Sequence, residues 1–320
     1  MAARPEASGL RVVELATLHA GSLSALLREE TERWRILLDW DFSSSAELVS
    51  RYASCRALEG FALLDEDRAV GYSYWVVDER KGLIGDLYVR DAWRSPFNEL
   101  TLLEATLRQL RRQPWLRRVE AQLMQLGIRG PLGDLQPQPA RFPRCFMLAQ
   151  LERLNSHRPV AYAGELAFAP WHMRYADEAA ELIARVYAGH IDSEINDQYK
   201  SAAGAMKFLQ NIVQYPGCGQ FCPECSLLAF DQDGRACGLL LATMVARTSG
   251  HVAQLCVEQG RRGTGLGYEL LRRALELFAS RGATSASLTV TASNRPAVGL
   301  YERFGFRTIH HFDAYVWDPF

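Results

Sequence analysis

The sequence predicts two consecutive α/β domains, each a mixed, mainly antiparallel sheet flanked by helices. The chain has 320 residues, of which 48% are hydrophobic, so it can bury two cores of ordinary size. Strand-like and helix-like patterns recur in the same order in the two halves. In the second half a strand, a glycine-rich loop and an amphipathic helix follow one another, as in a parallel crossover. The predicted domains are residues 1–155 and 156–320.

The elements of the two halves can be compared in order. In the first half, strands are predicted at 11–15, 58–64, 69–77, 83–89, 119–125 and 145–151, and helices from about 18, at 46–54 and at 99–112. The second half has predicted helices at 178–188 and 203–213 and strands at 226–230, 238–246 and 252–257. The polar segment 150–165 is the predicted junction. The apolar segment 34–42 is predicted to be core, with a contact between the copies as the alternative.

Residues 258–267 are the most informative segment, because glycines and two arginines precede an amphipathic helix that begins near Gly265. A helix N-terminus offers unpaired N–H groups, and glycines let a phosphate approach the backbone closely. The sequence therefore predicts a phosphate cradle. The loop lacks the Lys-Ser/Thr pair of a Walker motif, and Tyr268 stands where the dinucleotide fingerprint needs its third glycine.

A second segment, residues 288–306, is predicted to form a strand, then a helix with an N-cap, and then a glycine at which the helix ends. Asn294 is a typical N-cap, Pro296 suits the first turn, and Gly305 suits the left-handed position after the helix. Over about residues 225–320, the two segments together resemble the motifs of the GNAT acyltransferase superfamily. The residues that carry this resemblance are Arg262, Gly265 and Gly267 in the first motif and Asn294, Ala297, Leu300, Tyr301, Gly305 and Phe306 in the second.

The resemblance implies transfer of an acyl group from coenzyme A, usually acetyl from acetyl-CoA, to a primary amine by direct attack. It also implies that the loop binds the pyrophosphate and that the preceding strand pairs with the pantetheine arm through its backbone. The implied cofactor-binding residues are Leu255, Cys256, Val257, Arg262, Gly263, Thr264, Gly265, Leu266, Gly267 and Asn294. A non-catalytic CoA-binding or structural tandem module is the alternative from a different class.

Two residues are candidates for proton transfer. By resemblance, Tyr301 is the general acid that protonates the departing thiolate, and a phenol with a reference pKa near 10 can do so. Packing of Tyr301 on the helix face is the alternative. His251 is the candidate base, because histidine titrates near neutral pH; a surface position at the start of the strand is the alternative. Glu258 is a poor candidate, because it follows the strand beside the predicted phosphates.

The first half lacks this chemistry. After the predicted strand 83–89, the segment 90–98 contains no glycine, and Pro96 removes an amide donor. A proline- and glycine-rich segment, 127–144, stands in place of the Asn-to-Tyr helix. We therefore expect a degenerate copy that does not bind CoA and that shapes the substrate site or acts as a scaffold. Tandem GNAT proteins with one degenerate copy are a known arrangement in the family that the chain resembles.

The cysteines allow a competing interpretation. Cys218, Cys222 and Cys225 have a Cys-x3-Cys-x2-Cys spacing that occurs at some four-iron clusters, and three thiolates also begin a zinc site. No fourth ligand is expected nearby, so reduced thiols without a metal are predicted. Seven cysteines and an N-terminus without an apolar signal core predict a reducing, cytoplasmic setting.

Composition limits the partners that we expect. The net charge of −1 gives no general attraction to nucleic acid or to an anionic membrane, and no run of about 18 apolar residues spans a bilayer. The expected partner is a small-molecule or peptide amine acceptor, and the expected state is a monomer or a homodimer. Asp192, Glu194 and Asp197 would suit a cationic amine if they face inward, with a solvated charged loop as the alternative.

Overall fold

The computed structural model describes residues 9–129, 131–133, 135–152, 158–159, 166–215 and 217–320. The chain forms two compact units. Unit 1 comprises Met1–Trp34, Phe42–Pro143 and Phe312–Phe320, and unit 2 comprises Arg35–Asp41 and Arg144–His311. Most of the predicted junction 150–165 lies outside the described residues.

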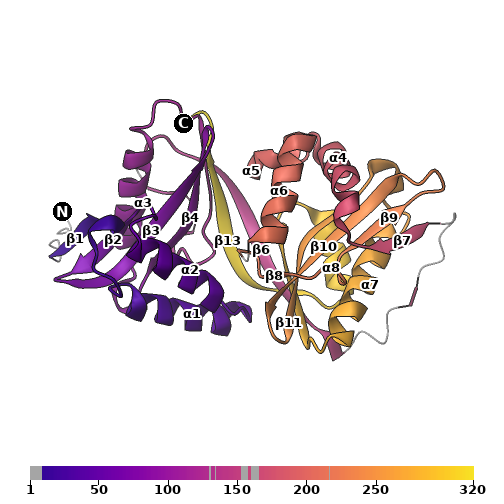
Figure 1. Cartoon of the computed structure of the whole chain (residues 1–320), viewed down its shortest axis with the longest axis horizontal. Helices are drawn as coiled ribbons and strands as arrows, with labels where there is room; N and C mark the ends of the chain where they lie inside the picture. Colours follow the sequence, from indigo (N-terminus) through magenta and orange to yellow (C-terminus); the bar gives the residue numbers. More distant parts are fainter. Residues whose placement is uncertain (1–8, 130, 134, 153–157, 160–165, 216) are drawn as a thin grey trace. The chain divides into compact units, whose positions relative to one another are not determined.

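Unit 1 is built on a mixed sheet in the order β1-β2-β3-β4-β5-β13 (Figure 1). Neighbouring strands are antiparallel except β4 and β5, which run parallel and are joined through helix α3. The strands are β1 Leu10–Glu14, β2 Gly60–Asp65, β3 Arg68–Asp78, β4 Lys81–Val89, β5 Arg118–Gln122 and β13 Arg307–Trp317. The helices are α1 Ser24–Leu38, α2 Ser43–Ser54 and α3 Pro96–Leu110.

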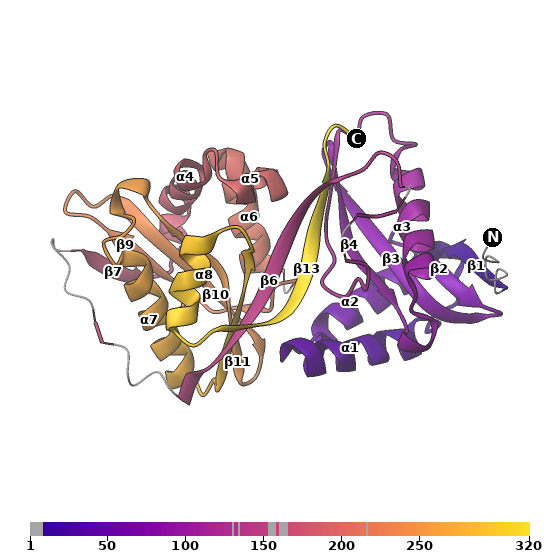
Figure 2. The same ribbon diagram turned by 180° about the vertical axis from the view of Figure 1, so that it is seen from behind.

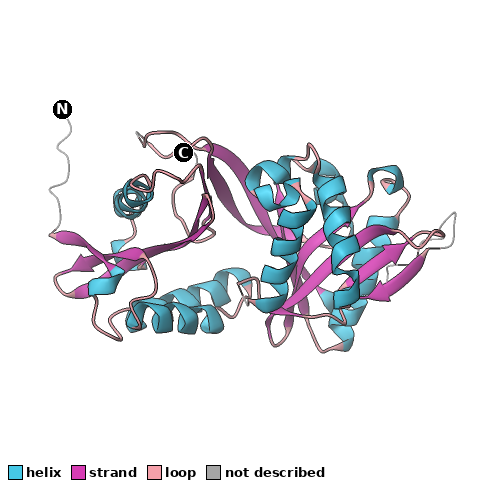
Figure 3. Ribbon diagram, turned by 45° about the horizontal axis from the view of Figure 1, so that its top comes forward, coloured by secondary structure: helices cyan, strands magenta, loops and turns pink. Residues whose placement is uncertain are grey.

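Unit 2 repeats this arrangement in the order β6-β12-β11-β10-β9-β7, with the short β8 pairing with β10. Figure 2 labels β6, β11, β10, β9 and β7 of this unit. Here β11 and β12 are the parallel pair, joined through helix α7. The strands are β6 Ala140–Gln150, β7 Ala167–Pro170, β8 Gln220–Phe221, β9 Leu227–Phe230, β10 Ala236–Ala246, β11 Ser249–Val257 and β12 Ser285–Thr291. The helices are α4 Ala176–Tyr187, α5 Ile191–Ile195, α6 Ala202–Gln214, α7 Leu266–Ser280 and α8 Arg295–Arg303 (Figure 3).

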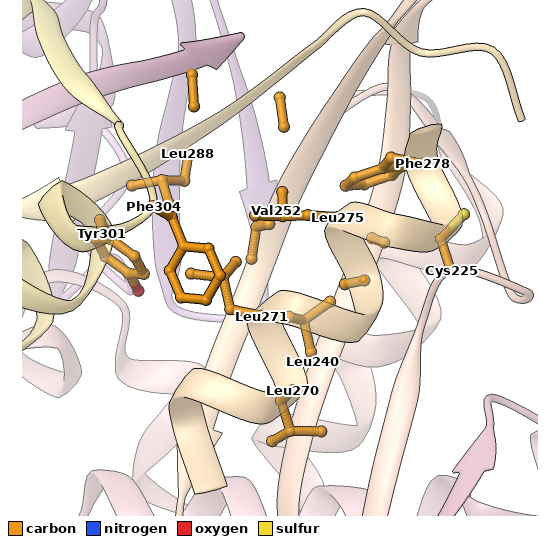
Figure 4. Packing of buried hydrophobic residues seen from close by; sticks show 14 of the residues in the cluster. Cys225, Leu240, Val252, Leu270, Leu271, Leu275, Phe278, Leu288, Tyr301 and Phe304 are labelled. Carbon is orange, nitrogen blue, oxygen red and sulfur yellow. The ribbon is translucent and has the colours of Figure 1, made fainter. Parts of the chain in front are cut away.

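Both faces of the unit 2 sheet are covered by helices, because each face carries apolar residues. The face under α7 and α8 contains Leu270, Phe278 and Phe304 in one buried cluster (Figure 4). The opposite face holds Ile183 of α4 and Leu209 of α6 in a second buried cluster. Full burial of one such side chain contributes about 1.5–3 kcal/mol, so these two clusters fix the sheet between its helix layers. Among the described residues, no helix is long and apolar enough to cross a bilayer.

The two units share an irregularity at the same place in the sheet. In unit 1 the register of β3 and β4 skips Gly85, and in unit 2 the register of β10 and β11 skips Ala253. One residue before each bulge, the parallel pairing stops, at Ile84 in β4 and at Val252 in β11. Because a bulge locally increases twist and bends the strand, it directs the end of β4 or β11 away from its parallel neighbour. The fold is therefore duplicated down to this detail.

The units exchange their last strands, which differs from the predicted boundary between 1–155 and 156–320. The strand predicted at 145–151 is the second part of β6, and it pairs with β12 in unit 2. The end of β13, at the C-terminus of the chain, pairs with β5 in unit 1. Periodicity identifies a strand but not its partner, so the sequence did not indicate this exchange. The segment 34–42 also contributes to both units, with Trp34 and Phe42 in unit 1 and 35–41 in unit 2.

Candidate functional site

The glycine-rich loop follows β11 and leads directly into α7. A short 3-10 turn covers Gln259–Arg261, and α7 begins at Leu266. Gly263 has φ +78° and Gly265 has φ +96°, in the left-handed region that costs other residues about 1–2 kcal/mol. Gly265 is the N-cap of α7, so no side chain of its own caps the first turn. The positive end of the helix dipole lies at this turn and favours an anion there.

The surroundings of the glycines show where an anion fits. A Cβ on Gly263 would meet no atom within 4 Å, so its backbone faces open space. A Cβ on Gly267 would lie 3.5 Å from Leu300 of α8 and 3.6 Å from Val257 of β11, so this glycine lies where α7 packs closely. The exposed Arg262 donates to the carbonyl of Val186 over 3.4 Å. The loop therefore offers backbone amides and a guanidinium, the groups that bind an anion at a helix start.

The far end of β11 has one edge that is not paired with β12. The parallel pairing runs from Ser249↔Ser285 to Val252↔Leu288 and stops there among the described residues. Along the other edge, the N–H of Glu258 donates to Cys237 of the preceding strand, β10. Antiparallel pairs alternate between hydrogen-bonded and non-hydrogen-bonded, so the backbone of Cys256 faces β10 as well. The backbone groups of Leu255 and Val257 therefore point toward the unpaired edge.

Cys256 consequently differs from Leu255 and Val257, the other two predicted pantetheine-binding residues, in the direction of its backbone groups. Its backbone pairs with Leu239 of β10, and its side chain is buried in the cluster with α4 and α6. Burial raises the pKa of the Cys256 thiol to about 12, so the thiol is protonated at neutral pH. The backbone groups of Leu255 and Val257, in contrast, face away from β10.

Tyr301 lies on α8, which begins and ends as predicted. The side chain of Asn294 caps the helix by accepting from the N–H of Ala297 over 3.3 Å, and Gly305 follows with φ +80°. The ring of Tyr301 is buried in the cluster with Phe304 (Figure 4). Burial raises the pKa of the Tyr301 phenol, and the negative charge of Asp192 raises it further. The ring thus packs in the core, while its hydroxyl lies within electrostatic reach of α5.

His251 lies in the paired part of β11 and not at its open end. Its ring is buried, 5.0 Å from the ring of Trp40 and 6.1 Å from that of Phe146. Its Nδ1 lies 2.9 Å from the hydroxyl of Ser287. Burial lowers the pKa of His251 to about 3, so the imidazole is neutral at physiological pH and is a weak base.

A polar cluster lies beside the unpaired ends of β11 and β12. Arg144 of β6 contacts Asp192 of α5 at 3.4 Å, and it donates to Thr291 and Thr289 of β12, each over 3.2 Å. Thr291 also donates to Asp192. We name these four residues the Arg144 cluster.

The three acidic residues that were predicted to suit a cationic amine, Asp192, Glu194 and Asp197, lie in different surroundings. Asp192 joins the Arg144 cluster, whereas Glu194 is exposed and pairs with Lys200 at 3.3 Å. Asp197 lies in the 3-10 turn Asp197–Lys200. The sequence did not indicate Arg144, because an arginine in a strand reads as a solvated residue until its neighbours are known.

The corresponding end of β4 in unit 1 is occupied by its own side chains. Arg94 donates to the carbonyl of Val89 over 2.9 Å and to the carbonyl of Gln125 over 2.9 Å. Ser95 caps α3 by accepting from the N–H of Asn98 over 3.2 Å. A side chain thus caps the helix after β4 in unit 1, whereas the helix after β11 in unit 2 begins at a glycine.

All seven cysteines are free thiols. Cys222 and Cys225 are buried, and Cys218 is exposed. Among the residues that the structure describes, no group of three or more His, Cys, Asp or Glu side chains is arranged to hold a metal ion.

Comparison with known proteins identifies the domain that carries this site. Residues 195–306 match the Acetyltransferase (GNAT) family. A mycothiol acetyltransferase of Clavibacter michiganensis is 36% identical over 132 residues, 41% of this chain and 39% of that protein. A mycothiol acetyltransferase of Acidimicrobium ferrooxidans is 28% identical over 284 residues, 83% of this chain and 84% of that protein. The chain thus spans well under half the length of the Clavibacter relative.

The fold gives the same result as the sequence match. The solved structure of a tandem GNAT protein from the clavulanic acid biosynthesis pathway matches with a TM-score of 0.63 and 15% identity, over 97% of this chain and 99% of that one. At this identity the likeness concerns the fold alone. Residues 195–306 therefore match the Acetyltransferase (GNAT) family, and the chain as a whole has the fold of a tandem GNAT protein.

Proposed function

We propose that this protein is an acyl-CoA-dependent N-acetyltransferase whose reaction takes place in unit 2. The observation that carries the proposal is the glycine-capped start of α7, which follows directly after β11, a strand whose pairing with β12 stops at Val252 among the described residues. The GNAT match over residues 195–306 supports the same function. The proposed setting is the cytoplasm, which seven free thiols support, because disulfides are rare in reducing compartments.

Acetyl-CoA is the proposed cosubstrate. The amides and the guanidinium of the glycine loop bind its pyrophosphate, and the backbone of β11 hydrogen-bonds its pantetheine arm. Asn294 acts indirectly, by capping the helix that presents Tyr301. The proposed binding residues are Leu255, Val257, Arg262, Gly263, Thr264, Gly265, Leu266 and Gly267.

The proposed chemistry is direct attack of an amine nitrogen on the thioester carbonyl. A C–N bond forms, the C–S bond breaks, and Tyr301 donates its proton to the departing sulfur. An N–H group on the open edge of β11 stabilises negative charge on the carbonyl oxygen. One proton of the acceptor restores the Tyr301 phenol, and the acceptor, if bound as an ammonium, releases one more to solvent. A route through an acyl-cysteine is disfavoured, because Cys256 is a protonated, buried thiol.

Calorimetry with acetyl-CoA and a free-thiol assay with a panel of primary amines test the proposal. We expect acetyl-CoA binding and amine-dependent release of CoA thiol. Binding without release across the panel favours the alternative, a non-catalytic CoA-binding module. No binding to the intact protein rejects the assignment of the glycine loop as a CoA site.

A further inference from the structure

A pair of cysteines with Cys-x2-Cys spacing lies in one tight turn between β8 and β9. Cys222 follows β8 directly, and Cys225 precedes β9. The N–H of Cys225 donates to the carbonyl of Cys222 over 3.2 Å, which closes the turn. In such a turn the first and fourth Cα atoms lie within about 7 Å, and the Cα atoms of a disulfide usually lie about 4.4–6.8 Å apart. The backbone therefore holds the two cysteines at a separation that a disulfide can span.

Backbone and hydroxyl groups fix this turn without any contribution from the thiols. The N–H of Cys222 donates to the carbonyl of Ala242 on β10 over 2.9 Å. The N–H of Ala242 donates to the hydroxyl of Ser226 over 2.9 Å, and this hydroxyl donates to the carbonyl of Cys222 over 2.8 Å. Because none of these bonds uses a sulfur, the pair can be oxidised and reduced while the backbone stays in place.

The two thiols have different surroundings. Cys225 is fully buried, in the cluster that contains Phe278 of α7 (Figure 4). The sulfur of Cys222 lies 3.7 Å from Oε2 of Glu224, whose side chain is 63% exposed. Glu224 also contacts Arg281, at the end of α7, over 3.8 Å. Cys222 therefore lies directly below the surface of the turn, whereas Cys225 lies in the core.

The contact between the two thiols favours the thiolate form of Cys222. A hydrogen bond from the Cys225 thiol lowers the pKa of Cys222, and the charge of Arg281 lowers it further, against burial and the charge of Glu224. The same hydrogen bond and burial raise the pKa of the Cys225 thiol. Because the thiolate is the nucleophile in disulfide exchange, the attacking sulfur belongs to Cys222 and the resolving sulfur to Cys225.

We propose that Cys222 and Cys225 form a reversible dithiol–disulfide centre that reduces low-molecular-weight disulfides. The Cys222 thiolate attacks one sulfur of the small disulfide, so a mixed S–S bond forms and one small thiolate leaves. Cys225 then loses its proton and attacks the Cys222 sulfur, which releases the second small thiolate. The two protons of the pair go to the two leaving thiolates, and two electrons pass to the small disulfide.

This centre uses none of the groups assigned to acyl transfer. Its turn lies beside Arg281, at the opposite end of α7 from the glycine loop. Its test therefore does not depend on the proposed acetyltransferase activity. Disulfides in reducing compartments are usually transient, which agrees with the free thiols of this structure.

The test treats the folded, reduced protein with oxidised glutathione, stops the reaction with acid, alkylates the remaining thiols and maps every cysteine by mass spectrometry. The variants are Cys222→Ser and Cys225→Ser, and the control is Cys218→Ser, at an exposed cysteine of the same segment. In wild type and control we expect a disulfide between Cys222 and Cys225 that dithiothreitol reverses. In Cys225→Ser we expect glutathione to remain attached to Cys222. In Cys222→Ser we expect oxidation of Cys225 to slow roughly tenfold or more.

Thermal unfolding establishes which variants are folded. The proposal is overturned if the disulfide forms only in urea, or if glutathione reacts in the folded wild type only with other cysteines. Unchanged oxidation of Cys225 in Cys222→Ser also overturns it. If a serine variant does not fold, the cysteine map of the wild type beside Cys218→Ser decides the outcome. Stoichiometric zinc or iron in the purified protein would contradict a redox role, because metal-bound thiolates are held as ligands.

Discussion

At the scale of single residues, the position of Tyr301 combines packing with chemistry. Its ring belongs to the apolar cluster under α7 and α8, which holds the side chain in one orientation. Its hydroxyl experiences the charges of Asp192 and Arg144. Because burial and Asp192 both raise its pKa, the phenol keeps its proton throughout the neutral range. The proton is therefore present on the phenol before the reaction, while the same shift makes the phenol a weaker acid than a solvated tyrosine.

Replacing Tyr301 with phenylalanine should lower turnover by roughly 10²-fold while acetyl-CoA affinity changes little, because the ring remains and one proton donor is lost. Thiol release under saturating substrates and calorimetry measure the two quantities. Tyr268→Phe, on α7, is the matched control, since it removes a phenol whose hydroxyl contacts the carbonyl of Arg158 instead. Near-normal turnover in Tyr301→Phe would contradict the general-acid role and show that Tyr301 contributes only to packing.

His251 should influence stability and not proton transfer. Its pKa of about 3 lies below the reference value of 6.5, so between these values the unfolded chain binds more protons than the folded protein. Its contribution to the free energy of unfolding is therefore fully present above pH 6.5 and is lost as pH falls toward 3, by at most about 1.4 kcal/mol per pH unit. Denaturant unfolding of wild type and His251→Gln across this range measures the difference, and identical pH slopes would contradict it.

At the scale of elements, the loop before α7 needs glycine for two separable reasons. One is the left-handed backbone, and the other is the close approach of a ligand. Gly282 has the first requirement without the second, because its φ is +84° and it follows the C-terminal end of α7, at the opposite end from the proposed phosphate site. Gly263 has nearly the same geometry, with φ +78° and open space.

Gly263→Ala and Gly282→Ala should therefore cost similar stability, about 1–2 kcal/mol each. Only Gly263→Ala should weaken acetyl-CoA binding, because its methyl group occupies the space beside the helix start. Thermal unfolding and calorimetry of both variants test this. Equal acetyl-CoA affinity in the two folded proteins would place the phosphate site elsewhere.

At the scale of the whole molecule, one duplicated fold contains a single open site. The ends of β4 and β11 have the same bulge and the same loss of parallel pairing. In unit 1, Arg94 donates to the carbonyl of Val89 and Ser95 caps α3, whereas in unit 2 the N-cap of α7 is a glycine without a side chain. The difference lies in the loop after the strand and not in the sheet.

We expect one CoA per chain as a consequence. Calorimetric titration should give a stoichiometry of one for the wild type. The same value is expected for Arg94→Ala, because Ser95 still caps α3 and the segment 90–98 has no glycine. A second equivalent in the wild type would show that unit 1 is not degenerate.

The exchanged strands predict how the chain can be divided. A fragment of residues 156–311 lacks β6 and leaves the edge of β12 unpaired, whereas a fragment of 140–311 keeps β6, and both omit the end of β13 that pairs with β5. Because exposed strand edges promote aggregation, only the longer fragment should remain monodisperse and bind acetyl-CoA. Gel filtration and calorimetry measure both properties. Equal behaviour of the two fragments would mean that β6 is dispensable for unit 2.

The sequence by itself determined the features that depend on local chemistry. The elements of both copies, the glycine loop and the Asn294-capped helix are fixed by periodicity, by φ preferences and by capping groups a few residues apart. The tandem GNAT fold could be predicted from these signals, as the comparisons confirm. The cofactor loop followed from the same information, although its role stays a prediction.

Only the tertiary structure decided what depends on strand pairing and burial. The partners of β6 and β13 join segments far apart in the sequence, so no local pattern contained them. Burial removed His251 from the set of effective bases, since the neighbours that desolvate it, Trp40 and Phe146, come from distant parts of the chain. The Arg144 cluster arose in the same way, from α5, β6 and β12. Long-range packing sets the environment of a side chain, and the environment decides its chemistry.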